Sequence, residues 1–112
     1  MKFLCLAYGS EADWSKLTAA EQEALLAQDR RIRERGAFMS ALRQDVTTIS
    51  AHGGEVLRSG APFAAARVPL AGFSIIEADS TEEVIDLVAG TPCARAGGAI
   101  EIWPLLENHG SA

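Results

Sequence analysis

The sequence predicts an α+β fold in which two helices cover one face of a mostly antiparallel sheet. Thr18 and Ser80 each stand three residues before a glutamate, a helix-capping pattern, and each opens a segment with a single apolar stripe. Around these segments lie short runs rich in β-branched and aromatic residues, which are typical of strands. Because each helix has only one apolar stripe to bury, we expect both helices to pack on the same face of the sheet.

Length and composition indicate one folded unit. A chain of 112 residues suits a single domain, which we place at residues 1–106, followed by a flexible tail at residues 107–112. Hydrophobic residues make up 48% of the chain and charged residues 22%, which is ordinary for a globular protein. The formal net charge of -5 argues against a nucleic-acid partner, since such binding depends on clustered Lys and Arg facing phosphates.

The apolar start of the chain does not indicate a membrane segment. The run from Phe3 to Tyr8 is too short to cross a bilayer and has no signal-peptide cleavage site behind it. Cys5 and Cys93 have no further Cys or His at metal-ligand spacing, so we expect free thiols in a reducing compartment. The sequence therefore predicts a cytoplasmic protein with no membrane partner, no bound metal and no cofactor.

The first half of the chain predicts a strand, a long helix and a second strand. Residues 2–8 are continuously apolar, which favours a central strand. The helix follows the capping pattern at residue 18 and runs to residue 35, where Gly36 suits the left-handed position that ends many helices. Residues 38–42 are a short apolar run that reads as a strand.

The second half of the chain predicts a hairpin, a strand, a helix and a last strand. A turn at residues 51–54 joins two extended arms, residues 46–50 and 55–58. Residues 59–69 are irregular and contain two prolines. The remaining elements are a strand at 70–77, a helix at 81–89 and a strand at 99–105.

This order of elements is that of a ferredoxin-like sandwich. Two helices cover only one face of such a sheet, yet the strands are apolar on both sides. The uncovered face needs burial, and a second copy of the chain is the simplest cover. We therefore expect a homodimer.

The loop at residues 59–73, the F-L-C-L-A-Y-G opening and the I-E-I-W-P-L ending resemble the YCII-related family in its D-G-P-F subgroup. The resemblance covers nearly the whole chain and implies a small dimeric α/β-barrel protein. The subgroup typically shows T-D-G-P-F-A-E-T-K-E-Q-L-G-G-F in this loop, whereas this chain has S-G-A-P-F-A-A-A-R-V-P-L-A-G-F. The loops are equal in length and identical at Pro62, Phe63, Ala64, Leu70, Gly72 and Phe73.

The loop has lost the acidic residues of the subgroup. Gly60 stands where the subgroup has Asp, Ala65 and Val68 stand where it has Glu, and Arg67 is the only charged residue left. A site that used those carboxylates for acid–base catalysis or metal ligation would lack its functional groups here. The broader family includes members proposed to use a His and Asp pair, and a lyase that removes chloride from a chlorinated hydroxyquinol. The first predicted helix contains no His, so that pair is not carried over.

Asp29 is the best candidate for a catalytic group. It falls on the apolar stripe of the first helix, between Leu25 and Ile32. Burial there would raise the pKa of its carboxyl and suit it to proton transfer. The alternative is an ion pair with Arg33, one turn later on the same helix, without a functional role.

Four other residues are candidate ligand contacts. Arg43 and Arg67 carry guanidinium groups, which grip carboxylates in bidentate fashion, and together they could hold an anion. Tyr8, with Trp14 just after it, would form an amphipathic wall at the mouth of a cleft. Phe63 belongs to the same loop as Arg67. The alternatives are surface arginines, and aromatic residues that pack in the core or at a dimer interface.

Two functions remain open on the sequence alone. The first is a small-molecule-binding protein, with an accessory or regulatory role, whose pocket at the sheet and loop 59–69 takes an anionic or neutral ligand. The second is a cofactor-free lyase or isomerase with Asp29 as general base and an arginine steadying an enolate-like oxygen. A buried Asp29 that opens into a cavity with an arginine opposite would favour the enzyme. An exposed Asp29 paired with Arg33 would favour the binding protein.

Overall fold

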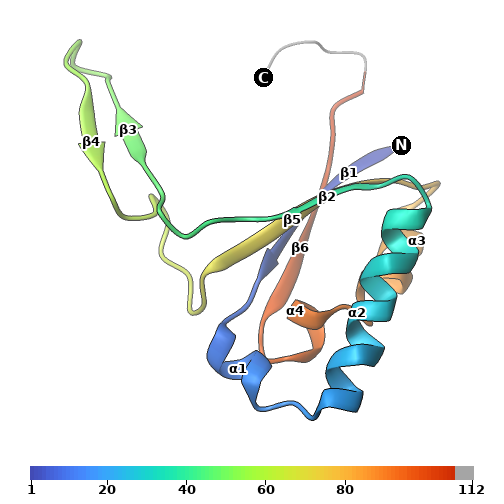
Figure 1. Ribbon diagram of the computed structural model, residues 1–112. Coiled ribbons are helices and arrows are strands. Elements are labelled where there is room, and N and C mark those ends of the chain that lie inside the picture. The colour runs from blue at the N-terminus through green and yellow to red at the C-terminus, as the bar shows by residue number, and fades with distance from the viewer. Residues whose placement is uncertain (108–112) are drawn as a thin grey trace.

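Helices cover one face of a four-stranded antiparallel sheet in the computed structural model, which describes residues 1–107 (Figure 1). The strands are β1 (Lys2–Tyr8), β2 (Phe38–Ala41), β5 (Leu70–Glu77) and β6 (Ala99–Pro104). They are arranged in the order β2-β5-β1-β6, with α2 (Ala19–Glu34) and α3 (Thr81–Val88) as the longest helices. The α+β class and the antiparallel sheet are as predicted, and the strand order is that of a ferredoxin-like fold.

Side chains of the central strands alternate between the helix-covered face and the open face. Phe3 and Cys5 of β1 are buried under the helices, and they pair in register with Ile76 and Ser74 of β5. The two longest helices complete the core with Ile32 from α2 and with Val84 and Val88 from α3. Because this one cluster includes residues of both helices, α2 and α3 pack on the same face, as the single apolar stripes predict.

Both long helices begin where the capping patterns predict. Thr18 accepts a hydrogen bond from the backbone N–H of Glu21, and the Glu21 carboxylate accepts one from the backbone N–H of Thr18. Ser80 likewise accepts from the N–H of Glu83. The Glu83 carboxylate, however, accepts from the N–H of Asp79, one residue earlier than a full capping box would have it.

The prediction of two helices is wrong in number, because the described residues contain two further short ones. Helix α1 (Glu11–Ser15) begins where the Ser10 hydroxyl accepts a hydrogen bond from the N–H of Asp13. Helix α4 (Pro92–Arg95) begins with a proline, which fits the first position of a helix as well as it ends the preceding one. Helix α4 lies beside α2, and α1 follows the end of β1 (Figure 1).

The predicted hairpin projects from the body of the molecule (Figure 1). It consists of β3 (Thr48–Ser50) and β4 (Leu57–Ser59), which pair only with each other among the described strands. The chain leaves the four-stranded sheet after β2 and returns to it at β5. This projection makes the molecule elongated: its radius of gyration is 15.9 Å, whereas a compact domain of this length has about 13 Å.

The two ends of the described chain lie close together. Glu107 accepts a hydrogen bond from the backbone N–H of Lys2 at 3.0 Å and pairs with the terminal amine of Met1 at 3.5 Å. The rest of the expected tail, residues 108–112, lies outside the described residues. Across residues 1–107, no helix has the length and apolarity needed to cross a membrane.

Candidate functional site

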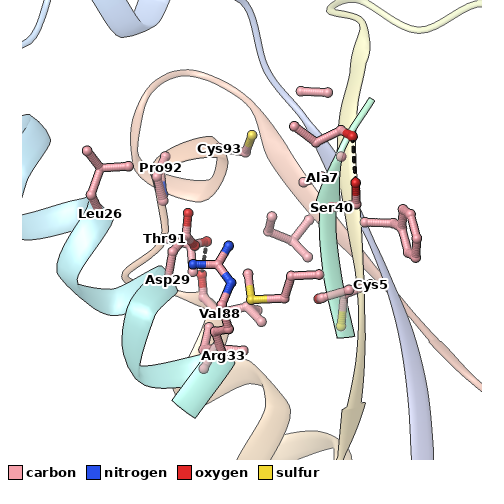
Figure 2. A pocket seen from close by; sticks show the side chains of 18 of the residues that line it. Cys5, Ala7, Leu26, Asp29, Arg33, Ser40, Val88, Thr91, Pro92 and Cys93 are labelled. Atoms are coloured by element: carbon pink, nitrogen blue, oxygen red, sulfur yellow. Dashed lines mark hydrogen bonds between the residues drawn. The ribbon is translucent and has the colours of Figure 1, made fainter. Parts of the chain in front are cut away.

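A cavity of about 400 Å³ lies between α2 and the covered face of the sheet (Figure 2). Residues of all four strands of this sheet and of all four helices line it. Small-molecule sites commonly have volumes of about 300 to 1,000 Å³ and mostly apolar walls. The lining here is mostly apolar, and its polar and charged side chains are Asp29, Arg33, Ser40, Ser74 and Thr91.

Small residues in register on three strands explain why the cavity forms here. Gly72 of β5 pairs with Ala7 of β1 on one side and with Ala41 of β2 on the other. All three line the cavity, and none has a side chain larger than a methyl group. Further along the same face, Phe3 pairs with Ile76 and both are fully buried. The helix layer therefore rests on large side chains at one end of the sheet and leaves space above the small ones.

Asp29 supplies a carboxyl group to the wall of the cavity. Leu26, Asp29 and Arg33 all line it, because spacings of three and four residues place them on one face of α2. Burial raises the pKa of the Asp29 carboxyl, and the charge of Arg33 offsets part of that rise. Within residues 1–107, no ion pair of 4.0 Å or less joins Asp29 to Arg33. Figure 2 shows both side chains projecting from α2 toward Thr91.

Two free thiols border the cavity, and burial favours the neutral form of each. Cys5 and Cys93 are both unpaired, as predicted. Burial raises the pKa of the Cys93 thiol, and the charge of the Asp29 carboxylate raises it further. Burial also raises the pKa of Cys5, and a hydrogen bond with Ser74 offsets part of that rise. Since the thiolate is the reactive form, both cysteines suit a small apolar wall better than a nucleophile.

The two aromatic residues predicted to form one wall lie on opposite faces of the sheet. Trp14 lines the cavity on the covered side. Tyr8 continues the alternation of β1 on the open side, where its hydroxyl donates a hydrogen bond to the Glu101 carboxylate at 3.2 Å. The indole N–H of Trp103 donates to the same carboxylate oxygen, also at 3.2 Å. Tyr8 therefore contacts a polar cluster on the open face and not the cavity.

The remaining predicted ligand contacts also lie away from the cavity. Arg43 pairs with Asp45 at 2.8 Å on the surface. Arg67 donates a hydrogen bond to the carbonyl oxygen of Gly97 at 2.8 Å. Phe63 exposes 92% of its surface. No residue of loop 59–69 lines the cavity, so the structure brings Asp29 and Trp14 together there without the two arginines.

Sequence reasoning missed the small residues that make the cavity and the polar groups that face it. Ala7, Ala41 and Gly72 carry no chemical signature, and Thr91 lies in a loop between two helices. The feature that could have revealed the cavity is the row of small side chains across β1, β5 and β2. Recognising that row requires the pairing register of the three strands, which the sequence does not supply.

The chain is an α+β protein of ferredoxin-like type with a cavity between the helix layer and the sheet. The YCII-related domain matches residues 1–108, and the chain belongs to this family. No curated protein sequence matches the chain. Among solved structures, it is similar to the 5-chloro-2-hydroxyhydroquinone dehydrochlorinase TftG from Burkholderia phenoliruptrix AC1100, determined in complex with 2,5-dihydroxybenzoquinone. The two share 19% identity with a TM-score of 0.49, over 95% of this chain and 94% of that chain.

Proposed function

We propose that this protein binds a small, largely apolar molecule in the cavity between α2 and the sheet, in a binding or accessory role. The supporting observation is a space of about 400 Å³ with a mostly apolar wall and a half-buried carboxyl group at Asp29. Asp29 can accept a hydrogen bond from a hydroxyl or amine, and Arg33 can donate to an oxygen. The ligand is therefore a neutral or anionic molecule with an apolar body and one polar end.

Thermal-shift screening of small alcohols, phenols and carboxylates tests this proposal. A compound present at about 100 times its Kd stabilises the folded state by about 2.7 kcal/mol, which is readily measured. Ala7→Leu narrows the cavity from the strand side, whereas Ala99→Leu adds the same atoms at an exposed strand position and serves as control. The compound should stabilise the wild type and Ala99→Leu but not Ala7→Leu. Equal stabilisation of all three would locate the ligand elsewhere and contradict the proposal.

One observation favours a second candidate function, a cofactor-free lyase or isomerase. Asp29 lines the cavity without an ion pair to Arg33, and Arg33 lines the same cavity from the next turn of α2. A carboxylate with a raised pKa suits a general base, and a guanidinium group can steady an oxygen that gains negative charge. The arginine comes from the same helix and not from the opposite wall, so the substrate would reach both groups from one side.

A comparison of binding with turnover separates the two functions. Asp29→Asn keeps the shape of the side chain but cannot accept a proton, whereas Glu34→Gln removes an exposed carboxylate from the same helix as control. For the enzyme, a bound compound is consumed by the wild type and by Glu34→Gln but not by Asp29→Asn. If no bound compound is ever converted, the binding protein stands. If Asp29→Asn converts the compound at the wild-type rate, Asp29 is not the general base.

The open face of the sheet supports a homodimer of dimeric α/β-barrel type. Phe38 exposes 63% and Trp103 55% of their surfaces on that face, and Phe38 packs on Phe73 with ring centroids 5.6 Å apart. Contiguous exposed apolar surface on a sheet marks an interaction site. A second copy related by a two-fold axis covers both open faces at once. Sedimentation of a monomer at micromolar concentration would contradict this assembly.

Three further assignments belong to the same proposal. Residues 1–106 act as a single domain, since one core includes β1, β5, α2 and α3. The loop identities from Pro62 to Phe73 support membership of the D-G-P-F subgroup. The two unpaired thiols support a cytoplasmic protein.

A further inference from the structure

The segment from Arg43 to Arg67, called the arm below, contains no buried residue within one copy of the chain. It includes β3 and β4, and every side chain in it except that of Thr48 is exposed. An isolated two-stranded hairpin is marginally stable in water, because ordering the backbone is opposed by conformational entropy and little apolar surface is buried in return. A defined hairpin in this position therefore needs a surface to pack on.

The arm carries the apolar side chains that such packing requires. Ile49, Val56 and Leu57 are all more than half exposed, and Phe63 is almost fully exposed. Single exposed apolar residues are ordinary on protein surfaces, but four large ones within 15 consecutive residues of one projecting segment are not. The arm thus presents an apolar surface to something outside its own chain.

The placement of the arm directs it toward the space beside the open sheet face. It leaves the sheet after β2 and returns at β5, and these two strands are neighbours at one edge of the sheet. Figure 1 shows the hairpin extending beyond that edge, away from the helix layer. A molecule seated on the open face would therefore lie within the region that the arm borders.

Charge favours a second copy of this chain as that molecule. The arm contains three arginines and two carboxylates, which gives it a formal net charge of +1. The rest of the chain carries a net charge of -6, and the two add to the total of -5. Arm and body of two copies therefore attract each other. In a two-fold arrangement, each arm reaches the other copy while the open faces meet, so one symmetry operation satisfies both exposed apolar surfaces.

We propose that the arm of each copy clasps the other copy, with Leu57 and Phe63 packed on the partner in the homodimer. This inference rests on the dimer proposed above and adds a second, separate contact to it. The arm then orders when two copies associate, and its apolar side chains account for part of the affinity.

Equilibrium sedimentation of the full chain and four variants tests the arm. Replacing a hot-spot residue of an interface raises Kd about 30-fold, and the two-fold axis applies each replacement twice. Leu57→Ser and Phe63→Ser should therefore raise the Kd of the dimer by roughly 1,000-fold each. Ile85→Ser removes another exposed apolar side chain, from α3 on the other side of the sheet, and should leave Kd unchanged. Trp103→Glu disrupts the open face directly.

The outcomes separate this inference from the dimer itself. A monomeric wild type contradicts both, and a monomer that instead sediments with phospholipid vesicles would make the arm a membrane contact. If Trp103→Glu dissociates the dimer while Leu57→Ser and Phe63→Ser do not, the sheet-face dimer stands and the clasp is wrong. Far-UV circular dichroism confirms that each variant is folded, which is expected because the substituted side chains are exposed.

Hydrogen exchange provides a test that needs no substitution. Amides of residues 48–50 and 57–59 should exchange slowly when the wild-type protein is concentrated enough to be dimeric. On dilution below Kd they should exchange much faster, while amides of β1 and β5 in the core of the body keep their protection. Arm exchange that does not depend on protein concentration overturns the inference.

Discussion

Ile32→Ala should be one of the most destabilising single substitutions in α2, because Ile32 joins the helix to the core beside the cavity. The side chain is fully buried and is the only fully buried one on α2 within the described residues. The substitution removes three carbons, each contributing about 0.8 kcal/mol when buried, which gives about 2.4 kcal/mol from transfer alone.

The cavity increases this cost. Ile32 already borders empty space, so the removed volume merges with the cavity, and the wall loses contacts that no neighbouring atom replaces. The higher helix propensity of alanine returns a few tenths of a kcal/mol. We therefore expect a loss of about 3 kcal/mol in the free energy of unfolding, within the range of roughly 2 to 5 kcal/mol known for such substitutions.

Urea denaturation followed by tryptophan fluorescence measures this loss. Leu26→Ala is the matched control, since Leu26 lies on the same helix and lines the same cavity but exposes 39% of its surface. It should cost about 1.5 kcal/mol, in proportion to its smaller burial. Both variants should keep the denaturant slope of the wild type. An Ile32→Ala variant that loses less than the Leu26→Ala control would refute the packing of α2 on the sheet described above.

Three further predictions concern the cavity and the helix cap. Asp29→Asn should be more stable than wild type at neutral pH: the folded-state pKa of Asp29 is raised by burial, so its contribution is fully present below the unfolded pKa and is lost as pH rises through the folded pKa. Parallel pH–stability curves for the two proteins would contradict this. Cys93 should be alkylated more slowly than a free thiol at pH 8, and faster in Asp29→Asn, as read by peptide mass spectrometry; equal rates in the two proteins would exclude the influence of the carboxylate. Thr18→Ala should lower the free energy of unfolding by about 1 kcal/mol while Thr18→Ser keeps it, as thermal unfolding would show, because only the alanine removes the cap.

Features with short-range causes could be predicted from the sequence. The ends of β1 and β5 follow from continuous apolar runs, and α2 follows from the cap at Thr18 and from Gly36, whose φ of 96° favours a residue without a Cβ. The short helices were missed because each starting residue also has another common role. Ser10 follows a strand as turn residues do, and Pro92 is as typical after a helix as at the start of one.

Features that depend on spatial pairing could not be predicted. The hairpin turn is visible in the sequence, but its separation from the main sheet is not, since β3 could equally have paired with another strand. Arg43 and Arg67 were predicted to contact a ligand because guanidinium groups bind anions, but the residue type alone does not determine where a side chain lies. Arg43 is held by Asp45, and Arg67 by the backbone of Gly97. Asp29 was placed correctly on the inner stripe because helix periodicity is local.

Gly72 links the cavity to the edge of the sheet and to the open face. A Cβ at this position would lie 2.8 Å from the carbonyl oxygen of Ser40, so the backbone of β2 can approach β5 closely only because the side chain is missing. The same missing side chain leaves the floor of the cavity open toward α2. The next residue, Phe73, points to the opposite face and packs on Phe38 of β2. One pair of residues therefore shapes the cavity on one side of the sheet and the surface proposed for dimerisation on the other. A substitution that moves β2, at the base of the arm, can therefore alter the shape of the cavity through the pairing of β2 with β5.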